Sequence, residues 1–200
     1  MKNIKEFKNR KELVEYFKAN AIKKIHDGGG EGGTYLSKNK EVLKFMLNSF
    51  EPKPIDQYPD IIMHGDIELE SFIFPKELFV LNGIIVGYRE DYFKGNVMDN
   101  LDKVDIDSLV KARKRFIEDA KVMADNKYYL FELLNNLVFD NKRLVAIDTL
   151  DYKKDNNVTL KDNISSLDYA LLNKLGFKYP DINVHKPFEK EIEKVYKLKR

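Results

Sequence analysis

The stretch HDGGGEGGTYLSKNKEVLKFM, from His26 to Met46, decides what the first half of the chain folds into. Five glycines lie between Gly28 and Gly33. Glycine loses more conformational freedom on folding than any other residue, so such a cluster needs a reason. After it, TYLS and EVLKF alternate apolar and polar side chains on either side of a turn at Lys38–Lys40. This pattern predicts two short strands after the glycines, and no helix.

The spacing of Gly28, Gly30 and Gly33 matches G-x-G-x-x-G, which two unrelated phosphate-binding devices share. In a dinucleotide-binding fold the third glycine opens a helix, and the predicted strands exclude that interpretation. In the other device a glycine-rich hairpin covers nucleotide phosphates and the next strand carries a lysine, which is the place of Lys44. The chain has no Gly-Lys-Ser/Thr, so a P-loop is excluded. A flexible surface loop with an exposed lysine is the alternative interpretation.

The rest of the first half is predicted to be mostly β. The apolar residues of segment 10–19 recur at helical spacing and predict a short amphipathic helix before the glycines. Three prolines in segment 51–60 disfavour a long helix there. Further on, FIFPKELFVLNGIIVGY predicts two strands around Asn82-Gly83, a strong signal for a two-residue hairpin turn.

The second half is predicted to be mainly helical. From Asp107 to Met123 the apolar residues recur every three or four positions, and Asp107 or Ser108 could cap this helix. A hairpin is predicted around Asn141-Lys142. Two closing helices are expected near 164–175, with Gly176 as a C-cap, and near 187–198.

From about Ile22 to Asp151 the chain resembles the protein-kinase-like superfamily, which includes the aminoglycoside and choline phosphotransferases. The resemblance is carried by "GGGEGGTYL…EVLKF" as glycine loop and strand lysine, "GYREDYFKG" as the hinge between lobes, and "NNLVFDNKRLVAIDTLD" as the end of the catalytic loop, a hairpin and the metal-binding aspartate. It implies an α+β, two-lobed kinase-like fold, with a β-rich N-lobe and a reduced helical C-lobe. The expected boundaries are an N-terminal helix at 1–21, the N-lobe at 22–90, the hinge at 91–96 and the C-lobe at 97–200.

The resemblance also implies a binding site for ATP and Mg²⁺. Gly28, Gly30, Gly33 and Lys44 would contact the phosphates, and segment Asp91–Phe93 would offer backbone groups to the adenine. Asn136 and Asp148 would hold Mg²⁺. The residues support this last pair independently, because a hairpin brings its two ends together, and two oxygen ligands suit an ion that keeps waters and phosphate oxygens.

Several features depart from the family's pattern, and three of them bear on the site. The family's catalytic base lies five residues before the metal-binding asparagine, and Phe131 stands there, so the adjacent Glu132 is the substitute candidate. Glu90 aligns with an apolar position beside the adenine pocket. The carboxylate that should face Lys44 falls in segment 51–60, where Asp56 and Asp60 are both candidates.

Two functions remain open on these grounds. The chain is an ATP-dependent phosphotransferase acting on a hydroxyl of an unknown acceptor, or a pseudokinase that serves as a binding module. Composition bounds the rest: the net charge of +2 gives no case for nucleic-acid binding, and the lack of cysteine excludes disulfides and thiolate metal sites. The sequence has no apolar run long enough to span a membrane and no signal-peptide pattern, so a cytoplasmic location is expected.

Overall fold

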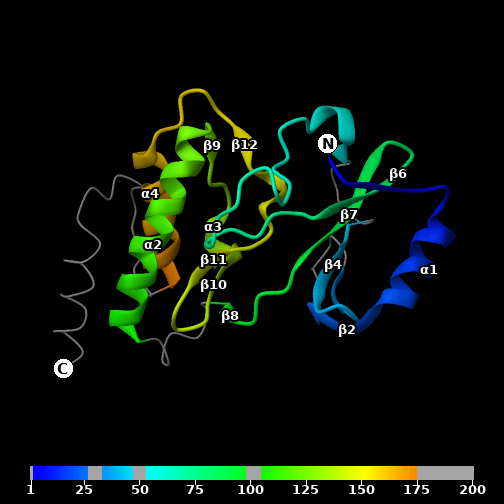
Figure 1. Cartoon of the computed structure of the whole chain (residues 1–200), viewed down its shortest axis with the longest axis horizontal. Coiled ribbons are helices and arrows are strands. Elements are labelled where there is room, and N and C mark those ends of the chain that lie inside the picture. Colours follow the sequence, from blue (N-terminus) through cyan, green and yellow to red (C-terminus); the bar gives the residue numbers. More distant parts are fainter. Residues whose placement is uncertain (1, 27–32, 47–52, 98–104, 175–200) are drawn as a thin grey trace. The chain divides into compact units, whose positions relative to one another are not determined.

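The computed structural model describes residues 2–26, 33–46, 53–97 and 105–174 of the chain. These residues form an α+β structure with one mixed sheet, two smaller antiparallel sheets and four α-helices (Figure 1). The α+β class predicted from the sequence is therefore confirmed. The chain divides into two compact units, Met1–Glu68 with Ile73–Phe93, and Leu69–Phe72 with the chain from Lys94 onward.

The first unit is built on a sheet in the order β1-β6-β7-β4-β3-β2, with β5 also paired to β7. Strand β1 runs parallel to β6, and the other neighbouring strands are antiparallel. In chain order the elements are β1 (Ile4–Phe7), α1 (Arg10–Asn20), β2 (Ala21–His26), β3 (Gly33–Ser37), β4 (Glu41–Phe45), β5 (Lys53–Pro54), the 3₁₀ turn η1 (Ile55–Gln57), β6 (Glu77–Leu81) and β7 (Ile84–Asp91).

Tight turns set the register of this sheet. Asn82 and Gly83 have φ values of 53° and 77°, and two positive values are what a type I′ turn requires between β6 and β7. Between β3 and β4, the Ser37 hydroxyl accepts hydrogen bonds from the backbone N–H of Asn39 and Glu41 at 3.3 and 3.0 Å. The strands predicted for TYLS and EVLKF and for both sides of Asn82-Gly83 are confirmed.

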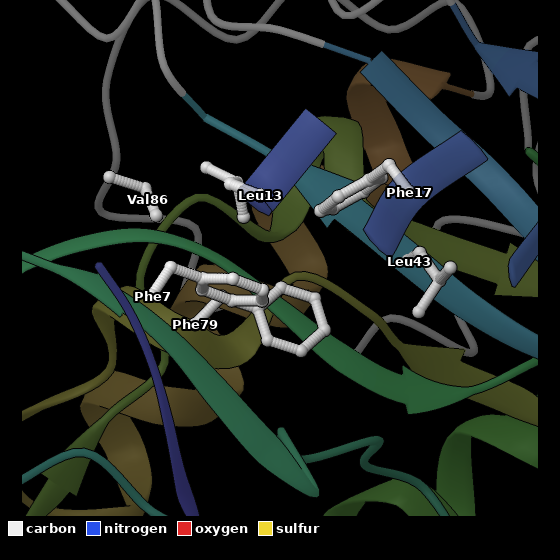
Figure 2. Close-up of a cluster of buried hydrophobic side chains, with 6 residues drawn as sticks. All are labelled: Phe7, Leu13, Phe17, Leu43, Phe79 and Val86. Carbon is white, nitrogen blue, oxygen red and sulfur yellow. The ribbon is translucent and has the colours of Figure 1, made fainter. Parts of the chain in front are cut away.

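Helix α1 covers one face of this sheet. Figure 2 shows the buried cluster on that face, which consists of Phe7, Leu13, Phe17, Leu43, Phe79 and Val86. The ring of Phe79 meets those of Phe7 and Phe17 edge to face, with centroids 5.9 and 5.6 Å apart, an arrangement that aromatic quadrupoles favour. Burying each such side chain contributes roughly 1.5–3 kcal/mol. Because neighbouring residues of a strand point to opposite faces, Leu43 faces α1 and Lys44 faces away from it.

The first twenty residues contain more than the predicted helix. Helix α1 begins after Asn9, whose side chain caps it by accepting from the Glu12 N–H at 3.0 Å. Strand β1 precedes it and belongs to the sheet, and the sequence analysis assigned no strand there. With only four residues, IKEF is too short to show the alternation of apolar and polar residues typical of a strand. Its partner strand β6 lies more than seventy positions away along the chain.

The second unit contains two long helices and two small sheets. Its elements are β8 (Asn96–Val97), α2 (Ile106–Asp125), β9 (Tyr128–Tyr129), α3 (Leu133–Asn136), β10 (Leu137–Phe139), β11 (Leu144–Ala146), the 3₁₀ turn η3 (Thr149–Asp151), β12 (Lys153–Lys154) and α4 (Leu160–Lys174). The sheets have the orders β11-β10-β8 and β12-β9. Segment Leu69–Phe72 joins this unit at β11, where Phe72 bridges to Ala146.

The helices α2 and α4 begin earlier than predicted, for a local reason in each case. Asp105 caps α2 by accepting from the Ser108 N–H at 3.2 Å, so the expected cap at Asp107 or Ser108 is wrong. Thr159 and Asp162 form a capping box that starts α4 at Leu160. The predicted hairpin around Asn141-Lys142 is confirmed as β10–β11. Gly176 and the helix expected near 187–198 lie outside the described residues.

A buried ion pair joins the two long helices. Arg113 of α2 donates two hydrogen bonds to the Asp168 carboxylate of α4, at 2.7 and 2.8 Å, and both side chains are 7% exposed. Two parallel N–H···O bonds satisfy both buried charges, which is the geometry that makes such burial tolerable. Within the described ranges, no helix combines the length and the apolar character needed to cross a bilayer.

Candidate functional site

The glycine-rich segment connects β2 to β3, which pair antiparallel. Gly28 and Gly30 lie outside the described residues. Gly33 is the first residue of β3 and is buried. A Cβ added to Gly33 would come within 2.7–2.9 Å of the Tyr35 ring. The lack of a side chain at Gly33 therefore makes room for the Tyr35 ring.

Lys44 lies on β4, the strand that follows the hairpin, and its register partners are Thr34 on β3 and Tyr88 on β7. Its side chain is half-buried, and its Nζ lies 5.6 Å from the centroid of the fully buried Tyr88 ring. An ammonium over an aromatic face is attracted by the negative charge of the π face. The lysine is thus held over one face of the sheet, opposite to α1.

Gly87 supports the backbone at this position, and the sequence analysis gave it no role. A Cβ on Gly87 would lie 2.2 Å from the carbonyl oxygen of Lys44, closer than real atoms approach. Only glycine lets β7 lie this close to β4. A glycine inside a predicted strand is the sequence signal that could have indicated such a close approach.

The segment predicted as a hinge follows β7 directly. Asp91 is the last residue of that strand, opposite Glu41, and its carboxylate accepts a hydrogen bond from Lys76 at 2.5 Å. The boundary between the two units falls just after Phe93. Asn96 begins β8, which pairs with β10. A contact from the backbone of Asp91 or Phe93 to an adenine stays a prediction.

The second unit brings Asn136 and Asp148 to one end of the β10–β11 hairpin. Asn136 ends α3 directly before β10, and Leu137 pairs with Ala146. One residue further out, the N–H of Ile147 donates to the Asn136 carbonyl at 2.9 Å, and Asp148 follows. The structure therefore confirms the geometric part of the prediction, that the hairpin brings its two ends together.

Two carboxylate residues of this unit share an unusual backbone conformation. Glu132 and Asp148 have φ values of 52° and 58°, in the left-handed region that most side chains avoid. Of the other non-glycine residues with positive φ in the described chain, Lys40, Asn82 and Asn141 lie in hairpin turns and Lys127 follows the end of α2. Such strain costs about 1–3 kcal/mol and is concentrated at functional sites. Glu132 and Asp148 directly precede helical turns, as the N-cap residues of α3 and η3, a position where the backbone is usually extended.

Phe131 and Glu132 are both exposed, Phe131 by 49%. The segment that carries them is anchored by Asn163 of α4, which is fully buried. The Asn163 side chain accepts from the N–H of Leu130 and donates to the carbonyl of Tyr128, both at 3.0 Å. Asn163 thus fixes the backbone two residues before Glu132. Only the folded structure shows this role, because the contact spans more than thirty positions.

Tyr152 adds a buried hydroxyl near Asp148. The residue is 2% exposed, and within the described parts of the chain its hydroxyl has no hydrogen-bond partner. Burial and, to a lesser extent, the negative charge of Asp148 raise the pKa of the Tyr152 hydroxyl. The hydroxyl therefore stays protonated at neutral pH and can donate a hydrogen bond. The sequence analysis gave Tyr152 no role.

The donor set at the end of the hairpin suits a magnesium ion better than a transition metal. Asn136 and Asp148 offer two hard oxygen ligands, and Mg²⁺ retains waters or phosphate oxygens at its other positions. No cluster of three or more histidine, aspartate or glutamate side chains that could enclose a metal occurs among the described residues. Binding of Mg²⁺ by Asn136 and Asp148 stays a prediction.

The second unit also has a hollow of about 300 Å³, away from these residues. It is lined by Glu70, Ser71, Ala112, Arg115, Glu118, Asp119, Arg143 and Leu144. Arg143 and Leu144 belong to the turn end of the β10–β11 hairpin, opposite to the end with Asn136 and Asp148. Its arginines and carboxylates are interspersed, so the hollow offers no surface of one charge to a ligand.

No protein-family model matches the chain, and no curated protein shows a significant match to it. The functional argument therefore rests on the chemistry and geometry of the chain's own residues.

Proposed function

We propose that this protein is a divergent member of the protein-kinase-like superfamily that binds ATP with Mg²⁺. In this proposal the glycine-rich segment and Lys44 contact the phosphates, and Asn136 and Asp148 hold the ion. The first unit corresponds to a β-rich N-lobe and the second to a helical C-lobe. The observation that carries the proposal is the end of the β10–β11 hairpin, where Asn136 and the left-handed Asp148 flank one hydrogen-bonded pair of strands.

The order of the parts supports the same proposal. A hairpin that contains the glycine-rich segment is followed by a strand with a half-buried lysine. Further along comes the short β10–β11 hairpin, with Asn136 just before its first strand and Asp148 after its second. Transfer of a phosphoryl group depends mostly on positioning and on neutralising charge. In this proposal Lys44 and a magnesium ion would supply that charge, so transfer would not depend on an ideal base.

The experiment that tests nucleotide binding is a thermal unfolding series with and without Mg-ATP. Binding to the folded protein alone adds about 2.7 kcal/mol to the free energy of unfolding at a hundredfold excess over the dissociation constant. Asn136→Ala and Asp148→Asn should each weaken this effect. Asn135→Ala, a change at the exposed neighbouring residue, is the matched control and should leave it intact. A wild-type protein whose melting temperature is unchanged by millimolar Mg-ATP would contradict the proposal.

We propose phosphoryl transfer to a hydroxyl as the activity, with Glu132 as the base. Glu132 is exposed, adjacent to the expected position and held in a strained backbone conformation. Glu132→Gln should lower turnover by about 10²–10⁴ while leaving nucleotide affinity nearly unchanged. One observation favours the second candidate, a pseudokinase: Phe131 occupies the base position and cannot accept a proton. A pseudokinase would bind Mg-ATP and yield no phosphorylated product in mass spectra.

A further inference from the structure

Glu90 is a buried carboxylate of the first unit. It lies on β7, one residue before the strand ends, and only 5% of it is exposed. A buried carboxylate is costly unless a cation or several hydrogen-bond donors compensate it. The role of Glu90 therefore depends on which cationic side chain lies close enough to compensate its charge.

Two cationic side chains near Glu90, Arg89 and Lys76, bind carboxylates on the face of the sheet that α1 covers. Arg89 binds Glu41 at 3.0 Å and Glu77 at 3.5 Å. Lys76 binds Asp91 at 2.5 Å and Glu41 at 3.6 Å. Because neighbouring residues of a strand alternate, Arg89 and Asp91 lie on the face that α1 covers, and Glu90 points to the opposite face.

Lys44 is the cation that β4 presents on the face of Glu90. In the β4–β7 register Val42 is opposite Glu90 and Lys44 is opposite Tyr88, so Lys44 and Glu90 are diagonal neighbours. Diagonal neighbours on one face lie about 7–8 Å apart at their backbones, within reach of a long side chain. The Lys44 Nζ lies over the ring of Tyr88, which is two residues from Glu90 on the same face.

We propose that Glu90 is the residue that positions Lys44 for contact with the nucleotide phosphates, an inference that rests on the proposed function. The resemblance predicts this carboxylate in segment 51–60. The structure instead has β5 and η1 at 53–57, and Asp56 and Asp60 are both exposed. Glu90 and Lys44 sit on adjacent strands of one sheet, so their relative position is fixed by strand pairing and needs no separate helix.

The test is a double-mutant cycle on the full-length protein with Glu90→Gln, Lys44→Met and the double variant. Mg-ATP and adenosine are the two ligands in calorimetric titrations. Each single change should weaken Mg-ATP binding by about tenfold, and the double variant should bind no worse than Lys44→Met alone. Adenosine lacks the phosphates, so its affinity should change less than twofold. Glu77→Gln is the control: it removes a carboxylate on the other face and should leave both affinities unchanged.

The same variants keep the inference testable without a nucleotide. In urea unfolding, the midpoint shifts of Glu90→Gln and Lys44→Met should be non-additive if the two side chains form a pair, whereas Glu77→Gln should add to Lys44→Met. If wild-type protein binds no Mg-ATP, the proposed function fails and the positioning role fails with it, while the midpoints still show whether the pair exists. Additive effects of Glu90→Gln and Lys44→Met on affinity and midpoint, or equal losses for ATP and adenosine, would overturn the inference.

Discussion

Asn163 gives the sharpest test of how the second unit holds its candidate catalytic segment. Its buried side chain satisfies two backbone groups, the N–H of Leu130 and the carbonyl of Tyr128, both at 3.0 Å. Asn163→Ala leaves both groups without this partner in the interior. Each buried polar group that loses its partner costs about 1–3 kcal/mol, and the better helix propensity of alanine returns about 0.5 kcal/mol. We expect the free energy of unfolding to fall by about 2–5 kcal/mol.

Asn173→Ala is the matched control on the same helix. The Asn173 side chain is half-buried and, within the described residues, donates to the Tyr169 carbonyl one turn earlier, so its loss should change stability by less than about 0.5 kcal/mol. The chain has no tryptophan, and circular dichroism during urea unfolding is therefore the suitable signal. Hydrogen exchange should also accelerate at the Leu130 amide in Asn163→Ala alone. Equal stability of the two variants would refute the anchoring role of Asn163.

Three further predictions test other parts of the structure. Gly87→Ala should lower the free energy of unfolding by about 1–3 kcal/mol, because its Cβ would meet the facing backbone oxygen at 2.2 Å; unchanged urea midpoints would contradict this close approach. Hydrogen bonds from Thr159 hold the pKa of Asp162 below its ordinary value of 3.8. The ionised Asp162 carboxylate therefore stabilises the fold fully above pH 3.8, and this stabilisation is lost as the pH falls through the lowered pKa. Unfolding midpoints of Asp162→Asn and wild type should therefore differ at pH 7 and converge in acid. Glu132→Gly and Lys127→Gly should both stabilise the protein by about 0.5–1 kcal/mol by relieving positive φ, and only Glu132→Gly should lower turnover, by about 10²–10⁴. Full turnover in Glu132→Gly would exclude Glu132 as the base.

Part of the candidate site could be predicted from the sequence because its residues are close together along the chain. Asn136 and Asp148 are joined by a short hairpin whose turn the sequence indicates, so their proximity follows from local structure. Lys44 was assigned to the strand after the glycine-rich hairpin for the same reason. The sequence indicates only that a glutamate is unusual at position 90. That Glu90 lies on the same face of the sheet as Lys44 depends on which strand pairs with β4, and local sequence does not show this.

What the sequence by itself determined are the elements with local causes. Asn82-Gly83 and Asn141-Lys142 specify their hairpins, and the spacing of apolar residues specifies α2, because turns and helices depend on residues a few positions apart. The Thr159–Asp162 capping box was present in the sequence and would have given the start of α4.

Only the tertiary structure decided the contacts between distant segments. It pairs β1 in parallel with β6, brings Gly87 against the backbone of Lys44, and sets Asn163 beneath the segment that carries Glu132. Local sequence does not show which distant segment each of these contacts joins. Each exists because burying apolar side chains brings particular strands and helices together, and the polar groups that become buried with them must then find partners across the fold.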